Sequence, residues 1–136
     1  EDNIRAFRSD WIKSVPYAYQ DVVDLYQQLM DAGYDVTLLT NFNQHTFLEA
    51  KAKYPFLGKA RSETVSGLVQ MIKPDAEIYQ HHTHTHDLER EQTLFIDDSA
   101  NNVAAARQCG WQAIHFAGRE GAARLHEELQ GYGVTL

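Results

Sequence analysis

Two adjacent carboxylates, Asp97 and Asp98, directly follow the apolar run at residues 94–96. Such a pair is costly at the end of a buried strand unless a cation neutralises it, and Mg²⁺ prefers carboxylate oxygens. Asn102 follows Asp98 by four residues, so on a helix it would face the same point. This spacing predicts a Mg²⁺ site. The alternative is that Asp98 or Ser99 only caps the following helix.

Two further positions could hold an anion. Thr40 and Asn41 end a second apolar run, at residues 36–39, and a hydroxyl followed by backbone N–H groups can hold a phosphate oxygen. Lys73 precedes a predicted helix N-terminus, where the ammonium and the helix dipole both favour an anion. Each has a plainer interpretation when taken alone: Thr40 could cap the next helix, and Lys73 could be a solvated loop residue.

Four histidines lie close together, at His81, His82, His84 and His86. His82 and His86 are four residues apart, so a helix would place them on one face, a spacing compatible with a metal. No cysteine, and no paired acid beyond Asp87, completes a ligand set. The favoured interpretation is therefore an exposed helix end that is rich in histidine, with metal binding as the alternative.

Alternating helices and strands must position these residues. Apolar strands are predicted at 36–39, 61–66, 93–97 and 112–116, and helices at 19–32, 44–53, 74–84, 100–109 and 119–129. Residues 4–14 also show helical spacing, and Pro16 would end that helix. The alternation implies an α/β fold with a parallel sheet covered by helices on both faces. In such sheets ligands bind at the carboxyl ends of the strands.

Length and charge limit the classes of function. The 136 residues amount to about one domain, and the net charge of -7 argues against nucleic acid as a partner, because phosphate backbones recruit excess Lys and Arg. No apolar run approaches the ~18 residues that span a bilayer, so we expect no membrane segment. The single cysteine, Cys109, fits a reducing compartment, and we expect a cytoplasmic protein.

Together these segments resemble the motifs of the haloacid dehalogenase (HAD) superfamily of hydrolases. Residues 36–41 are similar to its second motif, a hydrophobic strand ending in Ser or Thr. Lys73, within residues 71–79, is similar to the third motif, and residues 94–110 are similar to the fourth. The resemblance covers about residues 18 to 118 and is closest to the subgroup with a small helical cap (subclass I).

The resemblance implies a Rossmann-like three-layer α/β sandwich over residues 18–136, with residues 1–17 as the C-terminal end of the cap. It also implies a phosphatase acting on a small phosphorylated metabolite. In that reaction an aspartate attacks phosphorus, and water then hydrolyses the aspartyl-phosphate.

The resemblance assigns roles to the residues at the strand ends. Thr40 and the backbone of Asn41 would hold the transferring phosphoryl group, and Lys73 would pair with the phosphate and the nucleophile. Mg²⁺ would be the cofactor, bound by Asp98 with Asp97 as a second or outer ligand. Asn102 and Ser99 would support this acidic cluster.

The first motif of the superfamily, an apolar strand followed by Asp-x-Asp, finds no match. In the family fold that strand lies between the strands ending at Thr40 and Asp97. Without it, two pieces of sheet would face an empty slot with unpaired backbone groups. The chain also begins with Glu1 rather than Met. We therefore expect a C-terminal fragment, inactive alone, whose nucleophile comes from a missing N-terminal segment of the same protein.

Two alternative functions stay open. A 2-haloacid dehalogenase would direct the aspartate at carbon, but that reaction needs no magnesium, so the pair Asp97 and Asp98 favours the phosphatase. A catalytically silent binding or regulatory module would keep the fold without the nucleophile. The sequence upstream of Glu1 would separate these functions.

Overall fold

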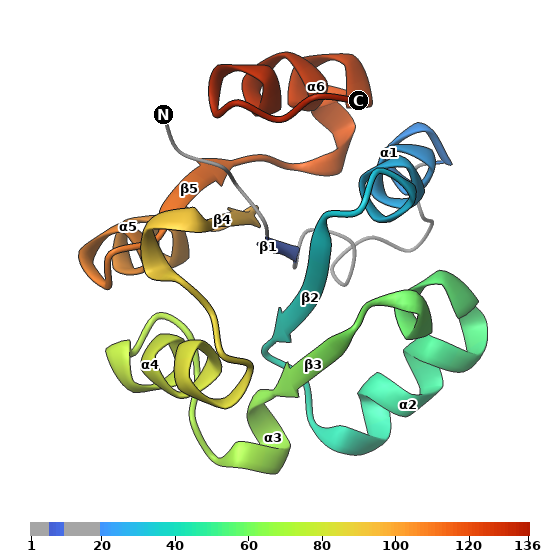
Figure 1. Cartoon of the computed structure of the whole chain (residues 1–136). Helices are drawn as coiled ribbons and strands as arrows, with labels where there is room; N and C mark the ends of the chain where they lie inside the picture. Colours follow the sequence, from blue (N-terminus) through green and yellow to red (C-terminus); the bar gives the residue numbers. More distant parts are fainter. Residues whose placement is uncertain (1–5, 10–19) are drawn as a thin grey trace.

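The computed structural model describes residues 6–9 and 20–136 (Figure 1). The strands are β1 Ala6–Ser9, β2 Asp35–Thr40, β3 Ser62–Val65, β4 Thr93–Asp97 and β5 Gln112–His115. The α-helices are α1 Gln20–Asp31, α2 Gln44–Lys53, α3 Ser66–Val69, α4 Ala76–Thr85, α5 Ala100–Gln108 and α6 Ala122–Gly131. Short 3₁₀ helices are η1 Pro55–Lys59, η2 Arg90–Gln92 and η3 Gly118–Glu120. None of the helices in the described ranges is both long and apolar enough to cross a membrane.

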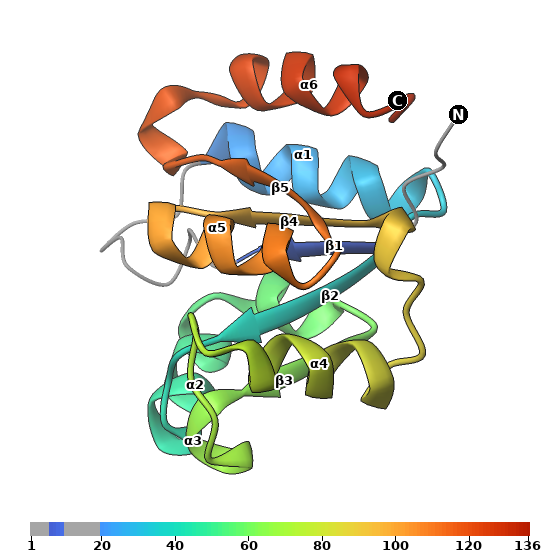
Figure 2. The ribbon, with the colours of Figure 1, turned by 90° about the vertical axis from the view of Figure 1, so that its left-hand side faces the viewer.

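The strands form one parallel sheet in the order β3-β2-β1-β4-β5. Their arrows point the same way in Figure 2, so the carboxyl ends of all the strands share one edge. This arrangement confirms the predicted α/β class and places the ends of β2 and β4 on the edge where ligands bind in such sheets.

The N-terminal segment differs from the sequence-based prediction. Residues 4–14 have helical spacing, but residues 6–9 form β1, so the helix prediction is wrong for them. Phe7 lies opposite Val36 of β2 on one side and opposite Leu94 of β4 on the other. β1 therefore fills the central position that was expected to be empty. As a strand, β1 pairs its backbone N–H and C=O groups with both β2 and β4. This pairing decides the conformation, because the helical periodicity of so short a segment is a weak signal.

The rest of that predicted helix lies outside the described residues. The boundary between a cap end at residues 1–17 and a core at residues 18–136 also falls there. It stays a prediction.

Two apolar layers cover the sheet. Successive side chains of β4 alternate between them: Leu94 and Ile96 pack with α1, α2 and α6, whereas Phe95 packs with α4 and α5. Figure 1 shows the same separation, with α4 and α5 on one face and α1, α2 and α6 on the other. The three-layer sandwich is thus confirmed, and β4 is buried along its whole length.

Two glycines set the path from helix to strand. Gly33 follows α1 with φ +91°, and Gly110 follows α5 with φ +92°, a backbone conformation that other residues rarely adopt. These turns lead the chain into β2 and β5, so both helices pack directly against the strands that follow them.

Candidate active site

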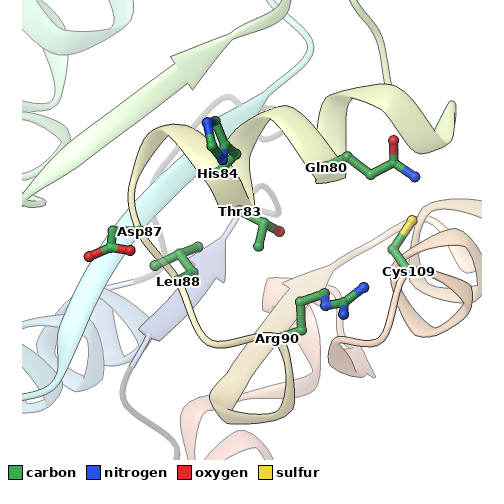
Figure 3. Close-up of a pocket in the computed structure, with 7 residues that line it drawn as sticks. All are labelled: Gln80, Thr83, His84, Asp87, Leu88, Arg90 and Cys109. Atoms are coloured by element: carbon green, nitrogen blue, oxygen red, sulfur yellow. The ribbon is translucent and has the colours of Figure 1, made fainter.

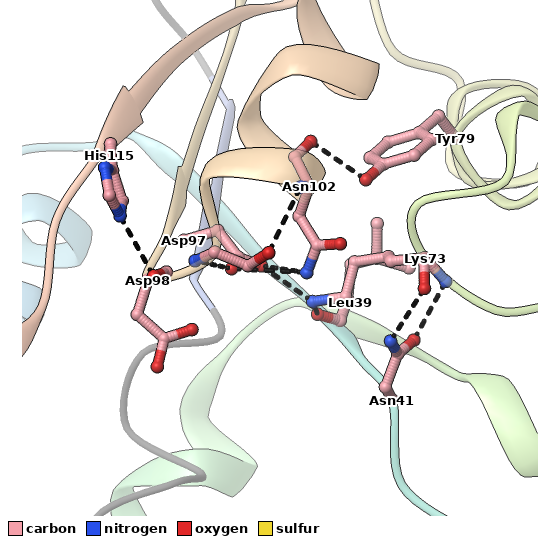
Figure 4. Close-up of polar contacts among 9 residues, drawn as sticks. Leu39, Asn41, Lys73, Tyr79, Asp97, Asp98, Asn102 and His115 are labelled. Carbon is pink, nitrogen blue, oxygen red and sulfur yellow. Dashed lines mark hydrogen bonds and ion pairs between the residues drawn. The ribbon is translucent and has the colours of Figure 1, made fainter.

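Asp97, the last residue of β4, is fully buried at the centre of a polar cluster on the carboxyl edge of the sheet (Figure 4). Its Oδ2 lies 2.9 Å from Nζ of Lys73, and its Oδ1 accepts a 2.8 Å hydrogen bond from the backbone N–H of Ser99. The side-chain Nδ2 of Asn102 lies 3.3 Å from both carboxylate oxygens. A cation, a backbone amide and a side-chain amide therefore compensate the burial of this charge.

Lys73 reaches Asp97 from the loop between α3 and α4, and its side chain is fully buried. Its Nζ also donates to the carbonyl of Leu39 in β2 at 3.0 Å. Burial lowers the pKa of Lys73 to about 8, against the opposing effect of Asp97. The alternative of a solvated loop lysine is wrong, because Lys73 joins the ends of two strands.

Asn41, the residue after β2, uses its side chain to hold Lys73. Its Oδ1 accepts a 3.0 Å hydrogen bond from the backbone N–H of Lys73, and its Nδ2 donates to the carbonyl of Lys73 at 3.1 Å. Sequence reasoning assigned only the backbone of Asn41, as a phosphate donor. The side-chain contact is new, since spacing along the chain cannot reveal a bond across 32 residues.

Thr40, the last residue of β2, is 4% exposed, and within the described residues its Oγ1 has no hydrogen-bond partner. The alternative of a helix cap is wrong for Thr40. Asn43 caps α2 instead, since its side chain accepts a 2.7 Å hydrogen bond from the backbone N–H of Thr46. Buried hydroxyls are nearly always paired, so this one is a candidate for completion by a ligand.

Ser99 is the N-cap of α5, and its Oγ accepts a 3.3 Å hydrogen bond from the backbone N–H of Asn102. The capping interpretation is therefore confirmed for Ser99. Tyr79 of α4 donates its hydroxyl to the carbonyl of Asn102 at 3.0 Å, which ties the two helices together behind the cluster. Sequence reasoning missed Tyr79, because no spacing connects α4 to α5.

Asp98 follows β4 and is partly exposed. Nε2 of His115 lies 3.0 Å from the backbone carbonyl of Asp98, and the Asp98 carboxylate points away from the contacts between Asp97 and Asn102 (Figure 4). Within residues 6–9 and 20–136, no group of three or more His, Cys, Asp or Glu side chains could hold a metal ion. Mg²⁺ at Asp98 would therefore need further oxygen ligands, such as water and phosphate.

Comparison with known proteins agrees with this geometry. The profile of the haloacid dehalogenase-like hydrolases matches residues 4–110. The chain belongs to this family. The sesquiterpene phosphatase astK of Aspergillus oryzae is 29% identical over 95 residues, which are 70% of this chain and 48% of that protein. The chain thus spans about half the length of this curated relative.

Solved structures with the same fold cover most of this HAD-like chain. An uncharacterized protein of Corynebacterium glutamicum matches with a TM-score of 0.75 and 18% identity, over 98% of both chains. The HAD family enzyme bt-2542 of Bacteroides thetaiotaomicron, in complex with magnesium and inorganic phosphate, matches with a TM-score of 0.69 and 23% identity. That match covers 86% of this chain and 58% of the other. At such identities the likeness shows the fold alone.

The histidine group lies apart from this HAD-like cluster. The imidazole of His82 is fully buried, and its two ring nitrogens meet the hydroxyls of Thr37 in β2 and Thr64 in β3. Nε2 of His86 lies 3.1 Å from Oγ1 of Thr64, and the rings of His82 and His86 are 4.4 Å apart between centroids. The predicted shared face is confirmed. His82 is a core residue with a hydroxyl at each ring nitrogen, so the prediction of an exposed helix end is wrong for His82.

Two cavities between α4 and α5 also lie apart from the HAD-like cluster. One has a volume of about 290 Å³ (Figure 3) and the other about 560 Å³. Both are lined by Gln80, Arg90 and Cys109, and neither by Thr40 or Asp97. The candidate active site therefore rests on the strand ends rather than on these cavities.

Proposed function

We propose that the protein containing this chain is a Mg²⁺-dependent phosphomonoester hydrolase that works through an aspartyl-phosphate intermediate. The observation that carries this proposal is the buried pair of Lys73 and Asp97 at the carboxyl edge of the sheet, the edge at which β2 also ends in Thr40 with its buried, unpaired hydroxyl. A fixed cation and a hydroxyl donor at one strand edge suit an anion with several oxygens. The name of the relative astK and the bt-2542 complex with magnesium and inorganic phosphate support the same chemistry.

Lys73 and Thr40 would contact the transferring phosphoryl group. During phosphoryl transfer, negative charge is spread over the oxygens, and donors that are already held in place stabilise it without reorganisation. The contacts from Leu39 and Asp97 hold the Lys73 ammonium in this way before any substrate binds. The Asn41 backbone N–H, just beyond Thr40, would add a further donor.

Asp98 is the residue that would hold Mg²⁺. Its carboxylate is partly exposed and directed away from the groups that neutralise Asp97. Asp97 fits an outer role, because its oxygens already accept from Lys73, Ser99 and Asn102. When bound, Mg²⁺ offsets the repulsion between the phosphate and an attacking carboxylate.

The attacking carboxylate has two candidate sources. We propose that it comes from a segment N-terminal to Glu1 in a longer protein, whose strand would take the central position that β1 holds in this chain, in keeping with the chain spanning about half of astK. Asp10 is the second candidate, because it directly follows Ser9, the last residue of the central strand β1. Asp10 is followed by Trp11 and Ile12, so it lacks the second aspartate of the family motif.

Turnover of p-nitrophenyl phosphate, with and without Mg²⁺, tests the proposal. We expect the longer protein to be active only with Mg²⁺, the 136-residue chain to be inactive, and Asp10→Asn to change nothing in the longer protein. Lys73→Met should abolish turnover, whereas the matched control Lys59→Met, at an exposed lysine, should not. Activity of the 136-residue chain that Asp10→Asn removes would assign Asp10 instead. No turnover by the longer protein would overturn the phosphatase.

One observation favours a second candidate, the silent binding or regulatory module. No Asp-x-Asp follows β1 in this sequence, although β1 holds the central position. Such a module would bind inorganic phosphate without turning over any phosphomonoester. Nothing in the described residues specifically favours the 2-haloacid dehalogenase.

The substrate class and the location complete the proposal. The substrate would be a small phosphorylated metabolite rather than a nucleic acid, in keeping with the net charge of -7. A cytoplasmic location would suit Cys109, the one cysteine of the chain, which is a free thiol.

A further inference from the structure

We propose that Asn41 is a positioning residue: its side-chain amide fixes the backbone of Lys73 so that the ammonium stays between Asp97 and the substrate phosphate. This inference rests on the proposed phosphatase and adds to it a residue that acts through Lys73. The contact is drawn in Figure 4, where the amide of Asn41 faces the main chain of Lys73.

Lys73 needs such support because no regular element holds it. The residue lies between the end of α3 at Val69 and the start of α4 at Ala76, in a loop that is neither helix nor strand. Buried backbone N–H and C=O groups must find partners, and those of Lys73 find both on one side chain.

An amide suits this position because it carries an acceptor and a donor on one planar group. The backbone N–H of Lys73 can only donate and its carbonyl can only accept, so a single orientation of the Asn41 amide satisfies both. Serine is too short to bridge the two atoms, and alanine offers neither partner.

The end of β2 therefore holds both the backbone and the side-chain ammonium of Lys73. Asn41 fixes its backbone, and the carbonyl of Leu39 accepts from its ammonium. Thr40 lies between these two residues in the sequence, so the same strand end sets the hydroxyl and the ammonium relative to each other. Loss of the Asn41 amide would free the loop and let water reach the ammonium.

Hydrogen exchange of the Lys73 backbone N–H, followed by NMR, tests this directly and needs no enzymatic activity. In Asn41→Ala this N–H should exchange about tenfold faster or more, because the Asn41 Oδ1 that accepts its hydrogen bond is gone. The control Asn43→Ala removes a nearby asparagine that caps α2 and does not contact Lys73. It should lower the midpoint of thermal unfolding and leave the exchange rate of the Lys73 N–H unchanged.

Kinetics of the phosphatase-competent protein give the second readout. Asn41→Ala should lower kcat about 10- to 100-fold with little change in KM, whereas Asn43→Ala should leave both unchanged. Asn41→Ser, which keeps a small polar side chain, should behave like Asn41→Ala and serves if the alanine variant does not fold.

The outcomes separate the two proposals. An unchanged exchange rate of the Lys73 N–H in Asn41→Ala or Asn41→Ser, or one that rises equally in Asn43→Ala, would overturn the positioning role even in an active phosphatase. A faster exchange rate in a protein that hydrolyses no phosphomonoester would support the positioning of Lys73 and overturn the phosphatase instead.

Discussion

Nζ of Lys73 and Oδ2 of Asp97 lie 2.9 Å apart, with both side chains completely buried. The two residues come from different elements, the loop before α4 and the end of β4. The presence of each charge helps the interior to tolerate the other, since an unpaired buried ion costs several kcal/mol. This pair links the stability of the sheet edge to the chemistry proposed for it.

Removal of one partner should therefore cost more than removal of both. Lys73→Met should lower the free energy of unfolding by about 3–5 kcal/mol, because it leaves the Asp97 carboxylate buried without its cation. Adding Asp97→Asn should restore part of that loss. Urea unfolding of the two single variants and the double variant measures the coupling. Additive losses would mean that the pair does not interact as described.

Stability should rise with pH between about 8 and 10. The pKa of Lys73 in the folded protein is about 8 and its ordinary value is 10.5, so in this range the unfolded chain holds a proton that the folded chain lacks. Above pH 10 the trend should reverse, because burial raises the pKa of Tyr26 and Tyr79 above their ordinary value of 10.0. Urea unfolding at a series of pH values should show the rise in wild type and not in Lys73→Met.

Replacement of His82 should destabilise the core. His82→Phe leaves the buried hydroxyl of Thr37 without its ring nitrogen and removes one of the two ring nitrogens at the Thr64 hydroxyl, at a cost of about 2–4 kcal/mol in the free energy of unfolding. His84→Phe, at an exposed position of the same helix, is the matched control and should change it by less than about 0.5 kcal/mol. Equal effects at the two positions would contradict the role of His82 in the core.

Gly67 should tolerate no side chain. A Cβ there would lie 2.6 Å from Cα of Asn43 and 3.0 Å from the carbonyl of Phe42, so Gly67→Ala should cost about 1–3 kcal/mol of stability. Gly131, at the end of α6, has nothing within 4 Å of such a Cβ, and Gly131→Ala should be neutral. Thermal unfolding of the two variants provides the comparison, and a neutral Gly67→Ala would contradict the close packing of α3 on the loop after β2.

The sequence predicted the elements whose patterns are long or unambiguous. The strand at residues 93–97 and the helix at residues 44–53 have the predicted bounds. For the strand, the reason is that a continuous apolar run marks a strand buried on both faces. β1 was missed because its four residues lie within a segment of helical spacing and show no strand pattern of their own. Its strand conformation comes from pairing with β2 and β4, which the local sequence does not show. α3 was missed for a similar reason, since it is a single turn.

The candidate site was only partly predictable. A parallel sheet places the ends of its strands on one edge, which suffices to bring Thr40 and Asp97 to the same side. The amide of Asn41 and the hydroxyl of Tyr79 contact residues that are far away in the sequence. Contacts of this kind depend on how loops and helices pack, and no local pattern encodes them.

A crystal structure of the longer protein with Mg²⁺ and inorganic phosphate tests the proposed site most directly. The phosphate should lie within hydrogen-bond distance of Oγ1 of Thr40 and Nζ of Lys73, with the metal on the Asp98 carboxylate. A phosphate bound elsewhere, with Thr40 Oγ1 still unpaired and no metal at Asp98, would contradict the assignment of this strand edge as the phosphoryl-transfer site.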